Sequence, residues 1–346
     1  MTAAVLLALW LIALPNGTDP MLGLPLAPVG EATLSGKTLF VIREGDFYSP
    51  AFSPDGRRLA YARDVVVGDT ELTEVFVRDL ATGKETKLLD AEASRKYAAY
   101  ASFVTQIEWK ESDRLVASIH DGDVGETEVL FDAASGRILS EEHFEGAVGP
   151  PPDDLTLSRL AATVPDWRRE VVETALINGF QVDRGYVVQK NYHGEDHHIW
   201  YLDVESKEAT RLLELPDDWL YALGGGVSFD SWILFLLHHE GKAYLLWYQE
   251  GRVALAREFE ATAGQFYTSL EVKHRSPERI FLAARLHGAS ARRHNPLLLV
   301  DRSGLKIVKN TGELYDVVFD SAGRLVCLVV WENGERHLVV QELGQQ

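Results

Sequence analysis

Cysteine is almost absent from this sequence, since Cys327 is its single example among 346 residues. A disulfide needs two cysteines, so an internal disulfide framework is excluded. Cys327 lies within the apolar run LVCLVVW. This setting indicates a buried small side chain and not a reactive thiol.

Basic residues are scarce relative to acidic ones. The chain has 34 Lys and Arg against 52 Asp and Glu, which gives a formal net charge of -18. Such a chain repels phosphate backbones, and it contains no basic cluster that would offset the repulsion. We therefore expect no nucleic-acid partner.

Long apolar runs are also missing. The run from Ala3 to Leu14 is too short to cross a hydrocarbon core of ~30 Å as a helix. Its length is typical of the apolar region of a secretory signal peptide, although an uncleaved anchor or a misassigned start codon would also account for it. We expect residues 1–36 to be signal peptide and Pro- and Gly-rich linker, and residues 37–346 to form one domain. The predicted location is periplasmic or secreted, with no stable membrane span after processing.

Several catalytic signatures do not occur. The sequence has no Gly-x-Ser-x-Gly elbow, no Walker loop, no dinucleotide fingerprint and no HExxH helix. These absences argue against a serine hydrolase, a P-loop nucleotidase, a dinucleotide enzyme and a zincin protease.

The most informative stretch that is present runs from Phe52 to Asp64 and reads FSPDGRRLAYARD. Asp55-Gly56 between runs of β-forming residues predicts a hairpin. The following VFVRDLATGKETKLL, from Val75 to Leu89, predicts a second hairpin with its turn near Gly83. Two hairpins make a small antiparallel sheet that cannot bury both faces alone, so we expect it to repeat.

The same pattern recurs along the chain. The pair Arg58-Leu59 has counterparts at Arg114-Leu115, Arg279-Ile280 and Arg324-Leu325, with Tyr186 and Ile233 at the equivalent place in two divergent copies. The later copies follow each other at about the 40 to 50 residues of a propeller blade. The turns of the second hairpin recur at Ala81–Lys84, Ala134–Arg137, Glu205–Lys207, Glu250–Arg252 and Arg302–Gly304.

The last copy is one strand short, because the chain stops at Gln346. The strand KTLFVIRE, Lys37 to Glu44, precedes the first copy and has no partner of its own. Pairing the two would leave no long sheet edge exposed. The predicted fold is therefore all-β: a six-bladed β-propeller of four-stranded antiparallel blades, closed by an N-terminal strand. Pro150 to Ile177 predicts a short helical insertion between blades 2 and 3, or alternatively part of a seventh blade.

The stretch FSPDGRRLAY resembles the WD-like repeat of TolB-type β-propellers, whose signature is an aromatic residue, then Ser-Pro-Asp-Gly, then an apolar strand. FVRDLATGKETKLL fits the last two strands of that repeat, and the later copies are degenerate. The resemblance implies a propeller, often periplasmic, that frequently acts as a protein-interaction scaffold.

Histidine and acidic residues gather where the second strand of each predicted blade leads into the third. Loops of this kind emerge on one face of a propeller and are a common place for binding. The candidate ligand or partner face comprises Asp64, His120, Asp121, Asp123, His193, His197, His238, His239, Arg285 and His287. Imidazole and carboxylate suit Zn²⁺ or Mn²⁺, so a divalent metal is one interpretation. The other is a set of solvated polar loops, and Asp121-Gly122-Asp123 lacks most ligands of a calcium loop.

The function that these observations favour is a non-catalytic, exported scaffold that binds a protein partner in the cell envelope. We expect a monomer without a resident cofactor and assign no catalytic residue. The alternative is a metal-dependent lyase or hydrolase, or a small-ligand-binding propeller, that uses the His-rich loop face.

Overall fold

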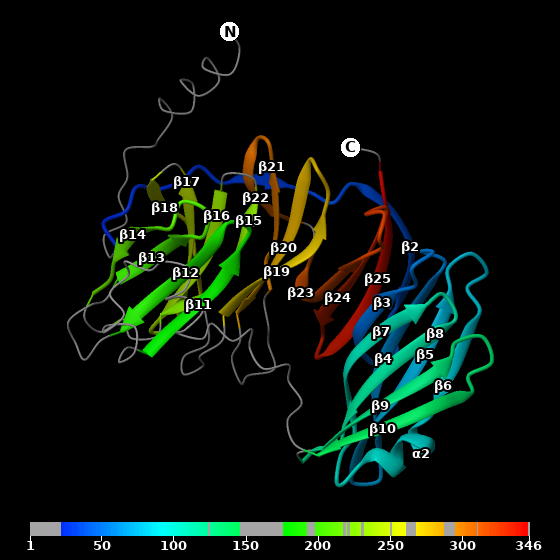
Figure 1. Ribbon diagram of the computed structural model, residues 1–346. Coiled ribbons are helices and arrows are strands. Elements are labelled where there is room, and N and C mark those ends of the chain that lie inside the picture. Colours follow the sequence, from blue (N-terminus) through cyan, green and yellow to red (C-terminus); the bar gives the residue numbers. More distant parts are fainter. Residues whose placement is uncertain are drawn as a thin grey trace. The chain divides into compact units, whose positions relative to one another are not determined.

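The computed structural model describes residues 22–123, 125–145, 176–191, 198–216, 219, 222–229, 232–249, 251–260, 268–286, 295–309 and 311–344. Within these ranges the strands form six four-stranded antiparallel sheets, one of which carries a fifth, parallel strand (Figure 1). This is the strand arrangement of a six-bladed β-propeller, so the predicted fold class is confirmed. The chain divides into two compact units, Met1–Ala32 with Asp153–Val308, and Thr33–Pro152 with Lys309–Gln346.

The unit that contains Thr33–Pro152 and Lys309–Gln346 holds three of the sheets. Blade 1 consists of β3 (Asp46–Phe52), β4 (Arg58–Val67), β5 (Thr70–Asp79) and β6 (Glu85–Leu89). Blade 2 consists of β7 (Phe103–Glu111), β8 (Arg114–His120), β9 (Gly125–Asp132) and β10 (Ile138–Glu145). Blade 6 consists of β23 (Glu313–Phe319), β24 (Leu325–Glu332), β25 (Glu335–Leu343) and β2 (Gly36–Ile42).

The other unit holds the remaining three sheets. Blade 3 consists of β11 (Leu176–Val182), β12 (Gly185–Asn191), β13 (His198–Asp203) and β14 (Glu208–Glu214). Blade 4 consists of β15 (Leu223–Phe229), β16 (Trp232–His239), β17 (Lys242–Gln249) and β18 (Arg252–Glu260). Blade 5 consists of β19 (Thr268–Arg275), β20 (Arg279–Leu286), β21 (Leu297–Asp301) and β22 (Gly304–Val308), with β1 (Gly30–Ala32) added parallel to β22.

The N-terminal strand β2 completes the last blade, as the strand count predicts. It pairs antiparallel with β25, and its register runs from Gly36 opposite Leu343 to Ile42 opposite Leu338 (Figure 1). Gly36 is required at this close approach, since a Cβ there would lie 2.2 Å from the carbonyl oxygen of Glu342. The two distant ends of the chain are therefore joined in one sheet.

The turns between strands explain why the repeats fold alike. Asp79 Oδ1 accepts hydrogen bonds from the backbone N–H groups of Ala81 (3.1 Å) and Thr82 (2.7 Å), and Gly83 follows at φ +70°. An aspartate side chain that bonds the backbone two and three residues on stabilises such a turn. The equivalent aspartates in blades 2, 3 and 5 make the same kind of bond, and they are Asp132, Asp203 and Asp301.

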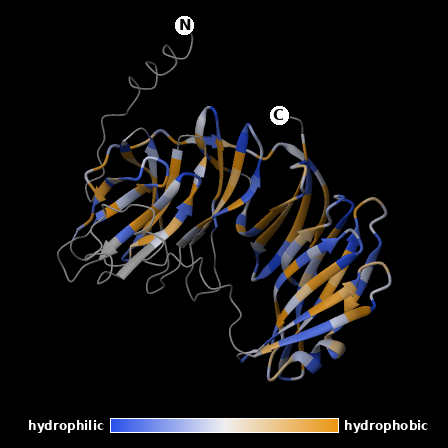
Figure 2. Ribbon diagram, in the orientation of Figure 1, coloured by the Kyte–Doolittle hydropathy of each residue, from blue (hydrophilic) through white to orange (hydrophobic). Residues whose placement is uncertain are grey.

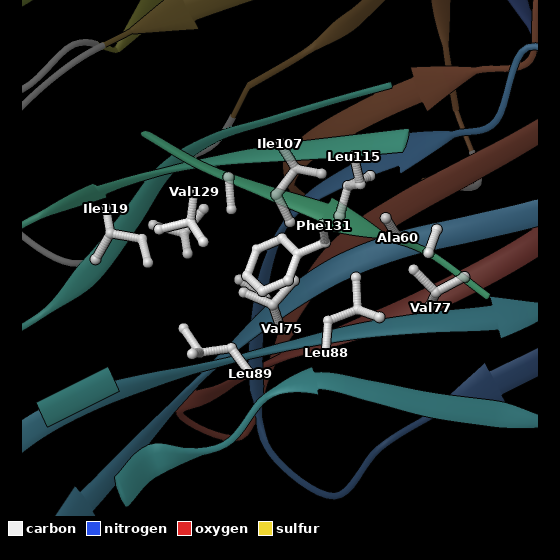
Figure 3. Packing of buried hydrophobic residues seen from close by; sticks show 14 of the residues in the cluster. Ala60, Val75, Val77, Leu88, Leu89, Ile107, Leu115, Ile119, Val129 and Phe131 are labelled. Atoms are coloured by element: carbon white, nitrogen blue, oxygen red, sulfur yellow. The ribbon is translucent and has the colours of Figure 1, made fainter. Parts of the chain in front are cut away.

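The core between blades 1 and 2 follows from strand alternation. Successive side chains of a strand point to opposite faces of its sheet, and in β4 both sets are buried, so hydrophobic stretches run along the strand (Figure 2). The set that faces blade 2 forms one cluster, in which Phe131 lies with Val75, Leu88 and Ile107 (Figure 3). Full burial of a side chain of this size contributes about 1.5–3 kcal/mol, which is why neighbouring sheets pack face to face.

Part of the segment expected as a linker is ordered against the strands. Leu26 bridges Leu255 of β18, the Ala27 N–H donates to the Leu255 carbonyl at 2.8 Å, and the Leu255 N–H donates to Pro25 at 3.0 Å. A few residues later β1 pairs with β22. Residues 25–32, called the strap below, thus lie along the outer strands of blades 4 and 5.

The helix that the structure describes is short and was not predicted. It is α2 (Ala91–Ser94), continued by a 3-10 turn, η1 (Arg95–Tyr97), after β6. The Asp90 side chain starts it by accepting a hydrogen bond from the Ala93 N–H at 2.7 Å. The helical insertion predicted over Pro150 to Ile177 falls almost entirely outside the described residues. None of the described helices is long and apolar enough to cross a membrane.

Candidate functional site

The predicted site positions occupy equivalent places in their blades. His120 is the last residue of β8 and pairs in register with Phe103, the first residue of β7. Asp64 of β4 likewise pairs with Asp46, the first residue of β3. Arg285 of β20 lies in register with Ser269 of β19. The sequence alignment therefore places residues at the same end of the second strand.

Asp64 belongs to a cluster of charged and aromatic side chains between blades 1 and 6. Arg336 of β25 donates from Nη2 to Asp64 Oδ2 at 2.8 Å and pairs through its guanidinium with both carboxylate oxygens of Asp46. The rings of Tyr48 and Tyr315 each lie 4.9 Å from the Arg336 guanidinium carbon. A guanidinium can form hydrogen bonds to carboxylates in its plane while its faces stack on aromatic rings. Arg336 therefore binds the two carboxylates and contacts the two tyrosine rings at the same time.

The protonation of this cluster follows from its burial. Burial raises the pKa of Asp64 to about 6, although hydrogen bonding from Tyr48 and the charge of Arg336 act in the opposite direction. Burial also lowers the pKa of Arg336, but hydrogen bonds to Asp46 raise it more, so the guanidinium stays charged. The Tyr48 hydroxyl bonds Thr73 Oγ1 at 2.8 Å and accepts from the Val104 N–H at 3.1 Å. The cluster therefore connects blades 1, 2 and 6.

His120 is held by a ring contact and a turn. Its imidazole stacks on Phe103 with ring centroids 4.8 Å apart, and its Nδ1 accepts from the Gly122 N–H at 3.0 Å. Since Nδ1 accepts this bond, the neutral ring carries its proton on Nε2.

Asp121 and Asp123 belong to the turn that follows. Asp121 Oδ1 accepts from the N–H groups of Asp123 (2.8 Å) and Gly125 (3.1 Å). These backbone bonds hold the pKa of Asp121 below its usual range. A carboxylate that accepts the N–H groups of its own turn is typical of a solvated turn and not of a calcium loop.

Three segments of blades 1 and 2 meet here, and we call their described residues, 64–72, 98–105, 118–123 and 125–127, the blade 1–2 corner. Glu71 bridges Ala101, and the Ser102 N–H donates to the Glu71 carbonyl at 2.9 Å. The Ala99 N–H donates to the Asp121 carbonyl at 3.0 Å. The corner contains Asp64, Asp69, Glu71, Asp121, Asp123 and Glu126, and no lysine or arginine.

His238 and His239 lie in blade 4 of the other unit. The His239 ring stacks on Trp219 at 4.5 Å with an interplanar angle of 14°. Burial, followed by the effect of His239, lowers the pKa of His238. The neutral form of His238 is therefore favoured.

The remaining candidates, His193, His197 and His287, fall outside the described residues. In the part of the chain that is described, no three His, Cys, Asp or Glu side chains are grouped to hold a metal ion. The metal interpretation therefore stays a prediction.

Two groups of residues were not predicted from the sequence. The first group has no local sequence signal, because its contacts join strands that are far apart in the chain; its members are Arg336, Asp46, Tyr48 and Tyr315. The exposed apolar residues of the blade 1–2 corner did leave a signal, since Val65-Val66-Val67 precedes Gly68-Asp69 at a hairpin tip where polar residues are expected.

No protein-family model and no curated protein matches this sequence. Among solved structures, TolB from Acinetobacter baumannii is 11% identical over 87% of this chain and 65% of its own, with a TM-score of 0.31. The β-propeller domain of the Trilobed protease from Pyrococcus furiosus is 16% identical over 86% of this chain and 79% of its own, with a TM-score of 0.32.

A structure from a study of two prolyl endopeptidases is 13% identical, with a TM-score of 0.30. The match covers 89% of this chain and 42% of the endopeptidase, so the chain spans less than half of that protein. TolB and a propeller domain are thus among the similar structures. At TM-scores near 0.3 these likenesses do not bear on activity.

Proposed function

We propose that this protein is an exported, non-catalytic β-propeller that presents a rigid acidic face to a protein partner in the cell envelope. The observation that carries the proposal is the charge of the blade 1–2 corner. Its segments contain no lysine or arginine and hold five carboxylates besides Asp64, which pairs with Arg336. Acidic surfaces of this kind steer positively charged partners and repel acidic ones.

The rigidity of the corner supports a scaffold role. Its three segments are joined through Glu71, Ala101 and Asp121 by backbone contacts, and beneath it the Tyr48 hydroxyl bonds both blades. A preorganised surface loses little conformational entropy when a partner binds. Export is supported by the apolar run from Ala3 to Leu14, which has signal-peptide length.

Capture with chemical cross-linking tests the proposal. The tagged protein is expressed in cells of the source organism, which are separated into envelope and cytosolic fractions. We expect the protein in the envelope fraction, together with one protein partner. Asp69→Lys combined with Glu71→Lys should lower the recovery of that partner, while Glu208→Lys, an exposed change in blade 3, should not.

Two results would contradict the proposal. A purely cytosolic location would remove the exported role. Stoichiometric Zn²⁺, Mn²⁺ or Ca²⁺ in the purified protein that His238→Ala abolishes would favour the metal-dependent alternative over a scaffold.

A further inference from the structure

The blade 1–2 corner also exposes apolar side chains. Val66 is 74% exposed, Tyr100 is 64% exposed, and Val67 and Phe103 are each 39% exposed. Single exposed apolar residues are ordinary on a protein surface, but a group of them within an acidic surround marks an interaction site.

Backbone pairing brings together the segments that carry these side chains. Val66 pairs with Glu71, and Glu71 in turn bridges Ala101, next to Tyr100. The Ser102 N–H also donates to the Glu71 carbonyl at 2.9 Å, so the tip of the hairpin that carries Val66 lies beside the segment that carries Tyr100 and Phe103.

Each of the two aromatic rings lies against the segment His120–Gly122. A Cβ on Gly122 would lie 3.1 Å from Tyr100 Cε2, so the Tyr100 ring lies against that turn. Phe103 stacks on His120. Aromatic side chains that are fixed before binding give large contact area at low entropic cost, as in the energetic centres of protein interfaces.

The acidic residues around the exposed apolar side chains indicate the charge of the partner. Arg63 directly precedes the corner in the chain and pairs with Glu74. Arg95 and Lys96 lie 3.4 Å from Glu92 and 2.6 Å from Glu141 in ion pairs, so each of the three has an acidic partner. Apart from Asp64, which pairs with Arg336, the carboxylates of the corner have no lysine or arginine in the same segments. A complementary surface is therefore positively charged and carries at least one apolar side chain.

We infer that the blade 1–2 corner binds a Lys- or Arg-rich segment of a partner protein through an aliphatic or aromatic side chain that packs on Val66, Tyr100 and Phe103. This inference rests on the proposed scaffold function and names the chemistry of its partner. The apolar contact supplies affinity, and the carboxylates supply selectivity and fast association.

A displayed library of random 12-residue peptides tests the inference. The library is selected on the purified full chain, and the enriched peptides are measured by fluorescence anisotropy. The loss variant combines Val66→Ser with Tyr100→Ser. The matched control is Val204→Ser, which changes a valine of 45% exposure on a turn of blade 3. Circular dichroism and thermal melting check that the variants fold.

We expect the enriched peptides to carry net positive charge and at least one aromatic or large aliphatic residue. The loss variant should weaken their binding by about tenfold or more, and Val204→Ser should leave it unchanged. Raising the salt concentration from about 50 to about 300 mM should weaken binding several-fold, because the attraction is screened.

Four outcomes would overturn the inference: no enrichment, enrichment of neutral or acidic peptides, equal binding to the loss variant, or self-association of the chain that the loss variant abolishes. The last would assign the surface to a second copy. If an envelope partner is captured whose binding the loss variant does not change, the scaffold function stands and this inference falls. If the peptides bind as expected but no envelope partner is captured, the inference stands and the scaffold function falls.

Discussion

Arg336 and Asp46 are separated by 290 residues in the sequence and are bonded to each other in the structure. The backbone N–H of Arg336 donates to Asp46 Oδ1 at 3.1 Å, and the guanidinium reaches both carboxylate oxygens. Arg336 lies in β25 and Asp46 begins β3, so this pair joins the last blade to the first within one unit.

Replacing Arg336 by Met should destabilise the protein strongly. Asp46 and the half-buried Asp64 would lose their cation, and removing one partner of a buried pair costs about 3–5 kcal/mol. Chemical denaturation followed by tryptophan fluorescence measures the free energy of unfolding. Arg43→Met is the matched control, since Arg43 pairs with Glu332 while 63% of its side chain is exposed. An exposed pair contributes about 0–1 kcal/mol, and equal losses in the two variants would refute this account of the cluster.

Asp64 should make stability depend on pH in mild acid. Its pKa is about 6 in the folded protein against 3.8 for an ordinary aspartate. As the pH rises from 3.8 to 6, the unfolded chain releases a proton that the folded chain retains, so stability falls. The full change is roughly 3 kcal/mol, at 1.36 kcal/mol for each pKa unit. Above about pH 6 the contribution of Asp64 to stability no longer changes with pH.

The Asp64→Asn variant isolates this effect. Because asparagine cannot titrate, its free energy of unfolding relative to wild type should rise between about pH 4 and pH 6.5. Asp132→Asn is the control. Backbone bonds, first from Ser135, hold the pKa of Asp132 below 3.8, so its contribution is lost only at lower pH. If the free energy of unfolding of Asp64→Asn relative to wild type did not change across this pH range, the raised pKa of Asp64 would be contradicted.

Ser53 of blade 1 and Asp320 of blade 6 each accept backbone hydrogen bonds at the turn before the second strand. The two side chains should stabilise that turn to different extents. Ser53 Oγ accepts from the Arg58 N–H at 3.0 Å, whereas Asp320 Oδ1 accepts from both Arg324 (2.6 Å) and Leu325 (2.7 Å). We expect Ser53→Ala to cost about 1 kcal/mol and Asp320→Ala about 3 kcal/mol, since bonds to a charged group are stronger. Asp320→Ser should recover part of the loss in denaturant unfolding. If Asp320→Ser recovered none of the lost stability, the two turns would not be equivalent.

Removal of the strap should expose the outer strands of blades 4 and 5. In a chain that begins at Ser35, the Leu255 N–H loses its bond to Pro25, and β22 loses β1. Amide hydrogen exchange measured by mass spectrometry should become faster in β18 and β22, because unpaired edge groups open to water. Peptides that cover β6 are the internal control and should exchange at an unchanged rate. Equal acceleration in β6 would indicate general destabilisation instead.

The fold was predictable because its determinants are local. The Asp55-Gly56 hairpin, the turn at Gly83 and the recurring Arg-Leu pairs each predict a strand boundary from a few adjacent residues. Counting strands then left β2 without a partner and the last blade without a strand, which predicted their pairing. The strap was not predicted, because Leu26 and Leu255 are paired by packing and carry no pattern in the sequence.

The candidate site was predictable only in position. Register confirms that Asp64 and His120 occupy equivalent places, but their side chains have different surroundings. Asp64 pairs with Arg336 in the interior of its unit, and His120 stacks on Phe103 near the surface. Side-chain surroundings depend on neighbouring blades, and the repeat pattern contains no information about them.

The sequence by itself determined the number of sheets, their four-stranded composition, the turns and the strand that completes the last blade, since alternation and turn chemistry act over a few residues. Only the tertiary structure decided that Arg336 lies between two carboxylates and two tyrosine rings, and that the segments carrying Val66, Tyr100 and Phe103 meet. Those groupings bring together residues from separate strands, and the free energy that selects them comes from packing between sheets.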